Sequence, residues 1–266
     1  MSLTVSVLVP DGIVLAADSL QSTSTQLVGE QELNITCPKC QEEIKTKMPI
    51  GPIRMPAGGS PFAQKLFNIK TRNIGILAYG SGFIRGRTIE SHIREFERLR
   101  IGGKETVEQV VDLLYEYFIT ELRKDKAFEK LPEDASLIGF QIAGYDKEDI
   151  TIGKLFVLDI AKKKRKRAVH PQGYSATWGG DGRVIQKLWA PSPGGPIPTP
   201  NYQSLTLQDA IDYAAYLIET TILYQRFAQM IPVVGGHIDI AVITHYGGFK
   251  WIKRKELPDI LEGKDT

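Results

Sequence analysis

Two apolar runs near the start of the chain flank a pair of turn-forming residues. Residues 4–9 and 12–17 are mostly apolar, several of them β-branched, and Pro10-Asp11 lies between them. Apolar runs separated by a two-residue connection are typical of two strands joined by a tight turn. The start of the chain is therefore predicted to be a β-hairpin.

The rest of the chain predicts further strands and amphipathic helices. Between 106 and 123, apolar residues recur at steps of three and four, which indicates one buried helix face. Other predicted helices are 86–100, 182–189 and 206–229, and other predicted strands are 74–79, 136–145, 154–160, 238–244 and 249–253. Because two groups of strands alternate with pairs of helices, we expect an α+β fold, a four-layer αββα sandwich.

The register of the hairpin brings an acid to the start of the chain. With the two turn residues at its centre, the hairpin places Asp18 opposite Leu3. The carboxylate of Asp18 then neighbours the hydroxyls of both Ser2 and Thr4, and hairpin counting alone does not choose between them. The same segment is compatible with an edge hairpin of an ordinary sheet, in which Asp18 only ends a strand.

The residue behind the initiator methionine carries a hydroxyl group. Removal of Met1 would give Ser2 a free α-amino group, whose reference pKa of about 7.7–8.0 leaves a useful fraction unprotonated near neutral pH. That amine can accept the hydroxyl proton without a histidine, which is the chemistry of N-terminal nucleophile hydrolases. Thr4 is the alternative nucleophile and would require the loss of residues 1–3.

Five segments in a fixed order carry a family resemblance. They are Thr4-Val5, 11–18, Lys65-Leu-Phe-Asn-Ile69, 75–80 and 235–244. Together they span nearly the whole chain, and their order resembles that of the β-type subunits of proteasomes and their bacterial relatives. The αββα sandwich is the fold of that family, and the resemblance implies one domain over residues 1–266.

The resemblance implies four catalytic residues. It places Ser2 where the family has its N-terminal threonine, Asp18 at the acid, Lys65 at the lysine and Gly80 at the oxyanion-binding amide. The positive charge of Lys65, held by Asp18, would lower the pKa of the nearby amine. The Gly80 N–H would stabilise the developing oxyanion, which is worth about 3–4 kcal/mol in comparable sites. Glycine also leaves room there for the substrate.

The chain departs from the family in three respects. Ser2 replaces threonine, which keeps the hydroxyl but loses the methyl group that restricts the rotamer. The serine and the acid that the family adds around the amine are expected at positions that here hold Gly179, Ile231 and Val234, so that network is absent or rebuilt. Family β subunits commonly carry a propeptide, whereas here ordinary removal of Met1 would have to expose the site.

A long segment at about 22–61 separates the hairpin from Lys65 and is interpreted as an insertion. It contains Cys37-Pro-Lys-Cys40, with the two cysteines of the chain, and a Gly/Pro-rich run. Two thiolates on a tight turn supply half of a tetrahedral shell, so Cys37 and Cys40 are candidate ligands of a structural zinc. A reduced metal-free turn and a local disulfide are the alternatives. The predicted chemistry itself requires no cofactor, and the insertion is in a position to overhang the active site and screen substrates.

Length and composition narrow the class of protein. With 266 residues, 42% of them hydrophobic and 24% charged, the chain can bury a substantial core. The net charge of +2 gives no reason to expect a nucleic-acid or membrane partner. No apolar run approaches the roughly 18 residues of a membrane span, and no basic region precedes a hydrophobic signal core. We therefore expect a soluble cytoplasmic protein.

The residues and the resemblance together favour a proteasome-like peptidase subunit of the threonine or serine type. Ser2 would attack peptide bonds of a protein or peptide substrate inside a homo-oligomeric ring, with an ATP-dependent unfoldase as an unidentified further partner. Two alternatives stay open: a non-catalytic subunit that forms or gates the ring, and an amidase or transpeptidase acting on another substrate. A purely structural subunit has no evident need for a buried pair of Asp18 and Lys65, which argues against the first.

Overall fold

The structure, a computed structural model, describes residues 2–36, 40, 43–125, 128, 136–149, 151–161, 165–169, 173–190 and 200–255. The chain forms two compact units. The larger unit consists of Met1–Gln21 and Ser60–Thr266, and the smaller is Ser22–Gly59. All four residues predicted to be catalytic belong to the larger unit.

The first sheet of the larger unit contains the N-terminal hairpin. Its five antiparallel strands follow the order β12-β1-β2-β13-β14 and are β1 (Leu3–Val9), β2 (Gly12–Asp18), β12 (Ser175–Gly180), β13 (Ile238–Thr244) and β14 (Gly248–Lys253). Val9 pairs with Gly12 and Thr4 with Ala17, which confirms the predicted hairpin and its register. Because β12 pairs with the other side of β1, the first strand lies inside the sheet.

The second sheet carries the other two predicted site residues. Its five antiparallel strands follow the order β11-β10-β9-β6-β5 and are β5 (Leu66–Ile69), β6 (Ile74–Gly80), β9 (Ser136–Gly144), β10 (Lys154–Ala161) and β11 (Arg165–Val169). Lys65 directly precedes β5, and Gly80 ends β6. A small sheet of β7 (Phe83–Ile84) and β8 (Arg87–Thr88) follows.

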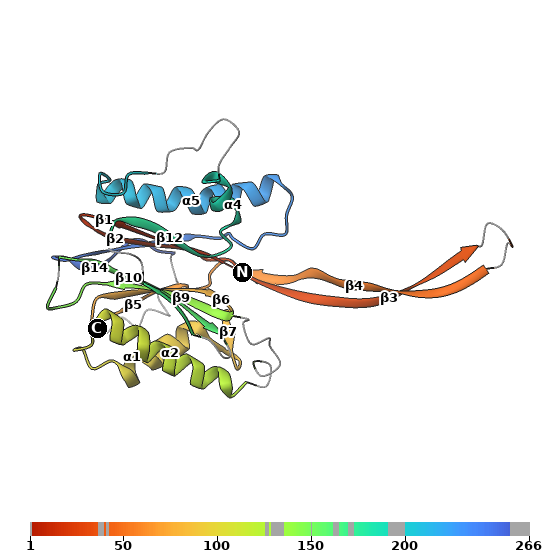
Figure 1. The fold of residues 1–266 in the computed structure, drawn as a ribbon, viewed down its shortest axis with the longest axis horizontal. Helices are drawn as coiled ribbons and strands as arrows, with labels where there is room; N and C mark the ends of the chain where they lie inside the picture. Colours follow the sequence, from red (N-terminus) through yellow and green to blue (C-terminus); the bar gives the residue numbers. More distant parts are fainter. Residues whose placement is uncertain are drawn as a thin grey trace. The chain divides into compact units, whose positions relative to one another are not determined.

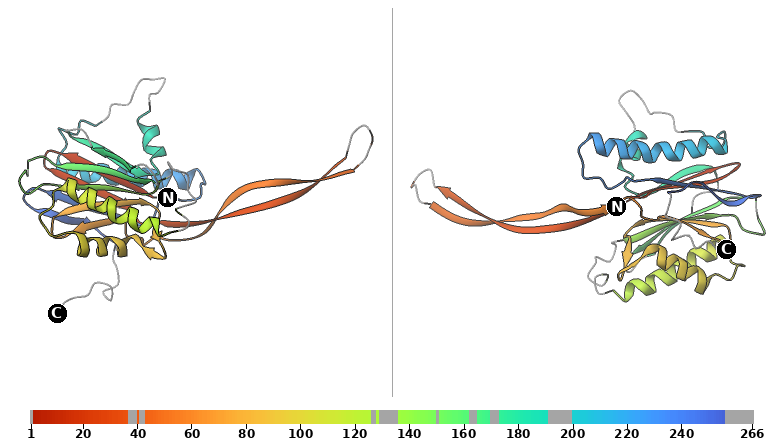
Figure 2. Two further views of the ribbon diagram at one scale, coloured as in Figure 1. Left: turned by 60° about the horizontal axis from the view of Figure 1, so that its bottom comes forward. Right: turned by 180° about the vertical axis from the view of Figure 1, so that it is seen from behind.

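Helices pack on both sheets (Figure 1). α4 (Arg183–Leu188) and α5 (Leu207–Phe227) lie on the first sheet, and α1 (Ile89–Arg100) and α2 (Val107–Arg123) lie on the second. The two views of Figure 2 show the same arrangement within the larger unit. Thr106 and Thr206 begin α2 and α5 with capping boxes, which satisfy backbone N–H groups at the helix starts. None of the helices in the described chain is long and apolar enough to cross a membrane.

Three apolar clusters hold the larger unit together. One lies between α1, α2 and the second sheet, another between α4, α5 and the first sheet, and the third is made of residues from both sheets. The structure therefore has mixed α and β composition, with antiparallel sheets and, among the described residues, four helices.

One predicted helix begins later than expected, and the short strands β7 and β8 of the larger unit were not predicted. The helix expected at 86 begins at Ile89, because Arg85 and Gly86 have φ values of 50° and 74° and form the turn between β7 and β8. Thr88 then caps α1 by accepting a hydrogen bond from the Ser91 N–H.

The smaller unit consists of two long strands. β3 (Gln21–Thr36) and β4 (Glu43–Ser60) form a two-stranded sheet, drawn as the long orange ribbon in Figure 1. No strand was predicted here, because the prolines and glycines between 49 and 61 disfavour strands.

Candidate active site

Two of the four predicted residues form a buried ion pair. Lys65 Nζ lies 2.7 Å from Asp18 Oδ1 and donates a second hydrogen bond, also of 2.7 Å, to the Leu20 carbonyl oxygen. The side chain of Asp18 is 0% exposed and that of Lys65 is 11% exposed. Because Asp18 ends β2 and Lys65 precedes β5, the pair links the two sheets at one end.

Backbone N–H groups fix the carboxylate of Asp18. Its Oδ1 accepts a hydrogen bond of 2.9 Å from Leu3 N, and its Oδ2 accepts bonds of 2.9 Å from Gly235 N and 3.2 Å from Leu20 N. The bond from Leu3 follows from the hairpin register that the sequence predicted. The carboxylate is thus tied to the residue that follows Ser2.

Burial lowers the pKa of the Lys65 ammonium below its usual value. Asp18 acts in the opposite direction through its charge and its hydrogen bond, and the charge of Lys255 lowers the pKa further. Lys255 itself is buried against Asp239, so a second ion pair contributes to the field around the first. The environment of Lys65 therefore makes its protonated form harder to maintain than on a surface.

Ser2 lies directly before β1 and is 2% exposed. Its Oγ is buried and makes no hydrogen bond to any residue that the structure describes. Its carbonyl oxygen accepts a hydrogen bond of 2.8 Å from Asp181 N. Gly180, with a φ of 87°, approaches so closely that an added Cβ would lie 1.9 Å from the same oxygen. A buried hydroxyl without a partner is rare in proteins and is an expected property of a reactive group.

Asp181 is a buried acid near Ser2 that was not assigned from the sequence. It is 6% exposed and forms a bidentate pair with Arg183, in which Nε and Nη2 each lie 2.7 Å from a carboxylate oxygen. Gln225 Nε2 on α5 adds a bond of 3.3 Å to Oδ2. The hydrogen bond from Arg183 lowers the pKa of Asp181, and the positive charge of the chain's N-terminus contributes to the shift. Asp181 thus lies at the start of the chain, where its N–H binds the Ser2 carbonyl oxygen.

The sequence signal for Asp181 was weak. Gly179-Gly-Asp-Gly182 before a short helix fits a flexible turn as well as a site. Only the pairing of β12 with β1, in which Gly180 lies opposite Leu3, brings this acid to the start of the chain.

The three positions at which the family resemblance predicted supporting residues have other roles here. An added Cβ on Gly179 would lie 2.3 Å from the ring of Tyr79, so glycine makes room for that ring. Val234 donates its N–H to Gln225 Oε1 at 3.2 Å, and Ile231 is 48% exposed. None of the three carries a hydroxyl or an acid, and Gln225 instead joins the backbone near Val234 to Asp181.

Gly80 occupies a position that demands glycine for a reason that the sequence analysis did not include. Its φ is 97°, and an added Cβ would lie 2.5 Å from the backbone oxygen of Leu137. The backbone conformation and the neighbouring strand therefore require glycine here, and space for a substrate stays a prediction. No hydrogen bond among the described residues joins Gly80 to Ser2, Asp18 or Lys65.

Thr4, the alternative nucleophile, is held inside the first sheet. It is fully buried, pairs with Ala17 on one side and Gly179 on the other, and its Oγ1 donates a bond of 3.4 Å to the Gly179 carbonyl oxygen. Exposure of a Thr4 amine would remove Leu3, whose N–H holds Asp18.

The proposed zinc ligands are not both described. Cys37 lies outside the described residues, and Cys40 is exposed. Within the described ranges, no group of three or more His, Cys, Asp or Glu residues is arranged to hold a metal ion. Zinc binding by Cys37 and Cys40 stays a prediction.

Comparison with known proteins identifies structural neighbours but no sequence family. No family model and no curated protein match the chain. An Anbu (Gly-1) mutant from Hyphomicrobium sp. strain MC1 superposes with a TM-score of 0.54 at 12% sequence identity, over 96% of this chain and 86% of that one. Anbu (ancestral beta-subunit) from Yersinia bercovieri gives a TM-score of 0.52 at 12% identity, over 98% of this chain and 91% of that one.

These findings correct the family drawn from the sequence. The chain was interpreted as a divergent proteasome β subunit of the N-terminal nucleophile hydrolases, but no family model or curated protein supports that membership. The motifs that suggested it are short and correspond to strands β2, β5, β6 and β13 and to part of β1. What the structural likeness shows is that the chain has the fold of the Anbu proteins.

Proposed function

We propose that this chain is a hydrolase in which the Ser2 hydroxyl, made N-terminal by removal of Met1, attacks the carbonyl carbon of a peptide bond. The buried pair of Asp18 and Lys65, tied to the start of β1 by the Leu3 N–H, is the observation that carries the proposal. A buried ion pair is often no more stabilising than apolar residues of the same size. The pair is tied to the residue that follows Ser2, whose buried hydroxyl makes no hydrogen bond to a described residue, and this favours a chemical use.

The proposed reaction uses the α-amine of Ser2 as the base. As Oγ attacks, its proton passes to the amine, and the carbonyl oxygen becomes an oxyanion that the Gly80 N–H is proposed to bind. The amine then gives the proton to the leaving nitrogen, the C–N bond breaks, and an ester to Ser2 remains. Water attacks this ester with the same amine as base, which releases the carboxylic acid and restores Ser2.

Two charged groups would set the pKa of this amine in opposite directions. The positive charge of Lys65 favours the neutral amine that acts as the base. The negative charge of Asp181 favours the ammonium form and would orient it, because Asp181 is itself fixed by Arg183 and Gln225.

We also infer the finer architecture and the assembly. The packing of helices on both sheets supports the four-layer αββα sandwich that the sequence predicted. The likeness to Anbu of Yersinia bercovieri, an ancestral beta-subunit, supports a role as one subunit of an assembly. In such an assembly the substrate would be a protein or peptide.

The test is the intact mass of the purified protein, with and without a peptide that carries a carbon electrophile such as a vinyl sulfone. We expect loss of Met1 and a single adduct that peptide sequencing maps to Ser2. The adduct should be absent in Ser2→Ala and retained in Thr4→Val, which removes the alternative hydroxyl with little change in shape.

Each other outcome has a defined meaning. Retained Met1 without an adduct would contradict the proposal and favour a non-catalytic subunit. An adduct on Thr4 would show that the nucleophile was assigned to the wrong residue. An adduct on Ser2 in a protein that hydrolyses no peptide would favour an amidase or transpeptidase.

A further inference from the structure

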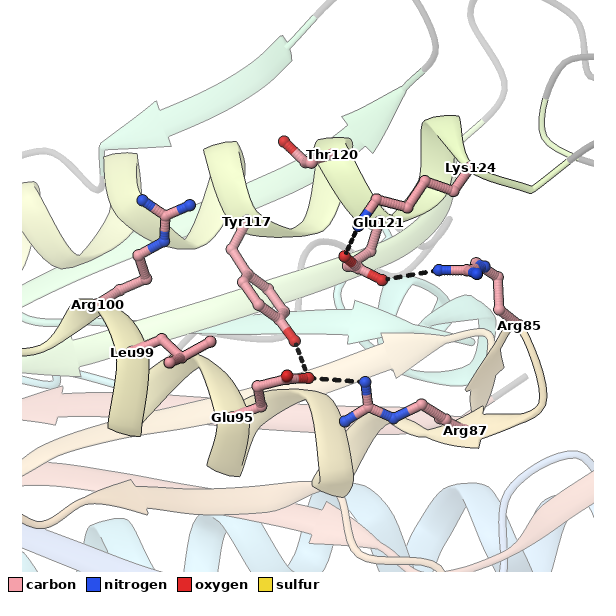
Figure 3. A pocket seen from close by; sticks show the side chains of 9 residues that line it. All are labelled: Arg85, Arg87, Glu95, Leu99, Arg100, Tyr117, Thr120, Glu121 and Lys124. Carbon is pink, nitrogen blue, oxygen red and sulfur yellow. Dashed lines mark hydrogen bonds and ion pairs between the residues drawn. The ribbon is translucent and has the colours of Figure 1, made fainter.

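A charged hollow of about 430 Å³ lies between α1, α2 and the turn that joins β7 to β8 (Figure 3). Its lining contains none of the residues of the candidate active site. The charged side chains that line it are Arg85 and Arg87 from the turn region, Glu95 and Arg100 from α1, and Glu121 and Lys124 from the α2 region. Three segments separate in the sequence thus bring their charges to one place.

The two carboxylates of the hollow are already paired. Glu95 lies 2.7 Å from Arg87 Nη1 and accepts a bond of 2.9 Å from the Tyr117 hydroxyl. Glu121 lies 2.5 Å from Lys124 Nζ and 3.3 Å from Arg85 Nη1. Figure 3 shows both carboxylates between their partners.

Both carboxylates also stay ionised near neutral pH. The hydrogen bond from Arg87 holds the pKa of Glu95 below its usual value. Partial burial acts to raise the pKa of Glu121, but the hydrogen bond and the charge of Lys124 outweigh it and lower the pKa. Neither group is therefore available as a neutral donor to a ligand.

The cations of the hollow outnumber the carboxylates. Four cationic side chains face two carboxylates, an excess of two positive charges. Arg100 has no hydrogen-bond or ion-pair partner among the residues that the structure describes, and Figure 3 shows its guanidinium apart from both acids. Arg85 binds Glu121 through one nitrogen, so the other N–H donors of its guanidinium bind no described residue. The unused donors are guanidinium groups, which fit the oxygens of a phosphate group in pairs.

Arg85 is placed in this hollow by an unfavourable backbone conformation. Its φ of 50°, followed by 74° at Gly86, is that of a hairpin turn in which both central residues have positive φ. Asn, Asp and Gly are preferred at the first of these positions, and a long side chain there carries a conformational cost. Strained backbone of this kind is concentrated at functional sites, which is consistent with a ligand-binding role for the Arg85 cation.

A buried polar chain supports the floor of the hollow. His92 is fully buried, and its two ring nitrogens lie 3.2 Å from the Tyr117 hydroxyl oxygen and 3.2 Å from the Ile84 carbonyl oxygen. Tyr117 in turn donates to Glu95. The chain connects the turn, α1 and α2, so the charged groups stand on a fixed base.

We propose that this hollow is a binding site for a small phosphate monoester. A phosphate monoester carries a charge of about −1.5 to −2 at neutral pH, which balances the excess of two positive charges. Its peripheral oxygens would accept hydrogen bonds from the unused guanidinium donors of the hollow, above all those of Arg100. A carboxylate ligand would leave half of the excess charge unbalanced.

The experiment measures the binding of glycerol phosphate and of inorganic phosphate to the full-length protein by isothermal titration calorimetry, at fixed ionic strength. We expect both to bind, with Arg100→Gln weakening the affinity roughly tenfold or more, because it removes charge-assisted hydrogen bonds. Arg98→Gln is the matched control, since Arg98 also lies in the last turn of α1 but does not line the hollow. It should change the affinity less than twofold.

Two further comparisons identify the ligand: glycerol phosphate with inorganic phosphate, and both phosphates with acetate. Tighter binding of glycerol phosphate than of inorganic phosphate would identify a phosphorylated small molecule as the ligand, and the reverse order would identify free phosphate. Acetate, a monoanion of one carboxylate, should bind at least tenfold more weakly than either. Circular dichroism of each variant checks that it is folded.

Three results would overturn the proposal. The first is the absence of measurable binding of either phosphate at about 10 mM, a concentration at which a site with a Kd of about 1 mM would be about nine-tenths filled. The second is an equal loss of affinity in Arg100→Gln and Arg98→Gln, which would indicate general surface electrostatics. The third is tighter binding of a poly-glutamate peptide than of either phosphate, which would point to an acidic protein partner.

Discussion

Replacement of Lys65 by methionine should destabilise the larger unit strongly. Methionine has a similar length and fills the same space, so the change removes the charge and two hydrogen bonds while it leaves the packing nearly intact. The carboxylate of Asp18 then stays buried without its cation, and the carbonyl oxygen of Leu20 loses a donor.

The magnitude follows from what remains around Asp18. Removal of one partner of a buried ion pair costs about 3–5 kcal/mol. Three backbone N–H groups still bind Asp18, and they favour the lower end of this range, a loss of about 3 kcal/mol in the free energy of unfolding. The matched control is Lys154→Met, which breaks the ion pair with Asp146. Because the side chain of Lys154 is 35% exposed, we expect a loss of at most about 1 kcal/mol there.

Because the pKa of Lys65 is lowered, the pH dependence of the free energy of unfolding provides a second measurement. Between that lowered pKa and the ordinary value of about 10.4, the unfolded chain binds more protons at this lysine than the folded protein does. The free energy of unfolding contributed by Lys65 therefore rises with pH over this alkaline window. In Lys65→Met this rise should be absent, whereas in Lys154→Met it should persist.

The assay is equilibrium unfolding in urea, followed by circular dichroism and tryptophan fluorescence across a series of pH values. An unchanged m-value would show that the variants unfold from a comparable native state. A loss below about 1 kcal/mol for Lys65→Met, or equal losses for the two variants, would refute the view that the Asp18–Lys65 pair is a desolvated charge pair.

Two further predictions concern glycine and the second acid. Gly80→Ala should lower the free energy of unfolding by at least about 2 kcal/mol, from backbone strain and overlap with Leu137. Gly86 has a φ of 74° but open space around it, so Gly86→Ala should lower it by only about 1 kcal/mol. Equal losses of the two variants in thermal unfolding would contradict this assignment. Asp181→Asn removes a negative charge near the Ser2 amine, so the rising limb of the kcat/KM profile should move to lower pH, by up to about one pH unit. Lys65→Met should move this limb to higher pH, and an Asp181→Asn profile that coincides with wild type would exclude an effect of Asp181 on the amine.

The sequence by itself determined the elements whose contacts are local. The N-terminal hairpin and the placement of Asp18 opposite Leu3 follow from a two-residue turn, because a short connection fixes the register of both strands. The amphipathic face of α2 was equally clear, since its buried residues recur within the helix itself. Lys65 came from the resemblance of ordered motifs, and the structure places it on Asp18.

Tertiary structure alone decided which distant residues surround Ser2. Asp181 reaches the start of the chain only because β12 pairs with β1, and the order of strands in a sheet depends on packing across the whole unit. The reason for glycine at position 80 also lies in a neighbouring strand, through Leu137. The long strands β3 and β4 were hidden by prolines and glycines, which disfavour strands when the chain is considered locally. Local pattern thus fixed the hairpin that carries the candidate site, and non-local strand pairing supplied the groups that complete it.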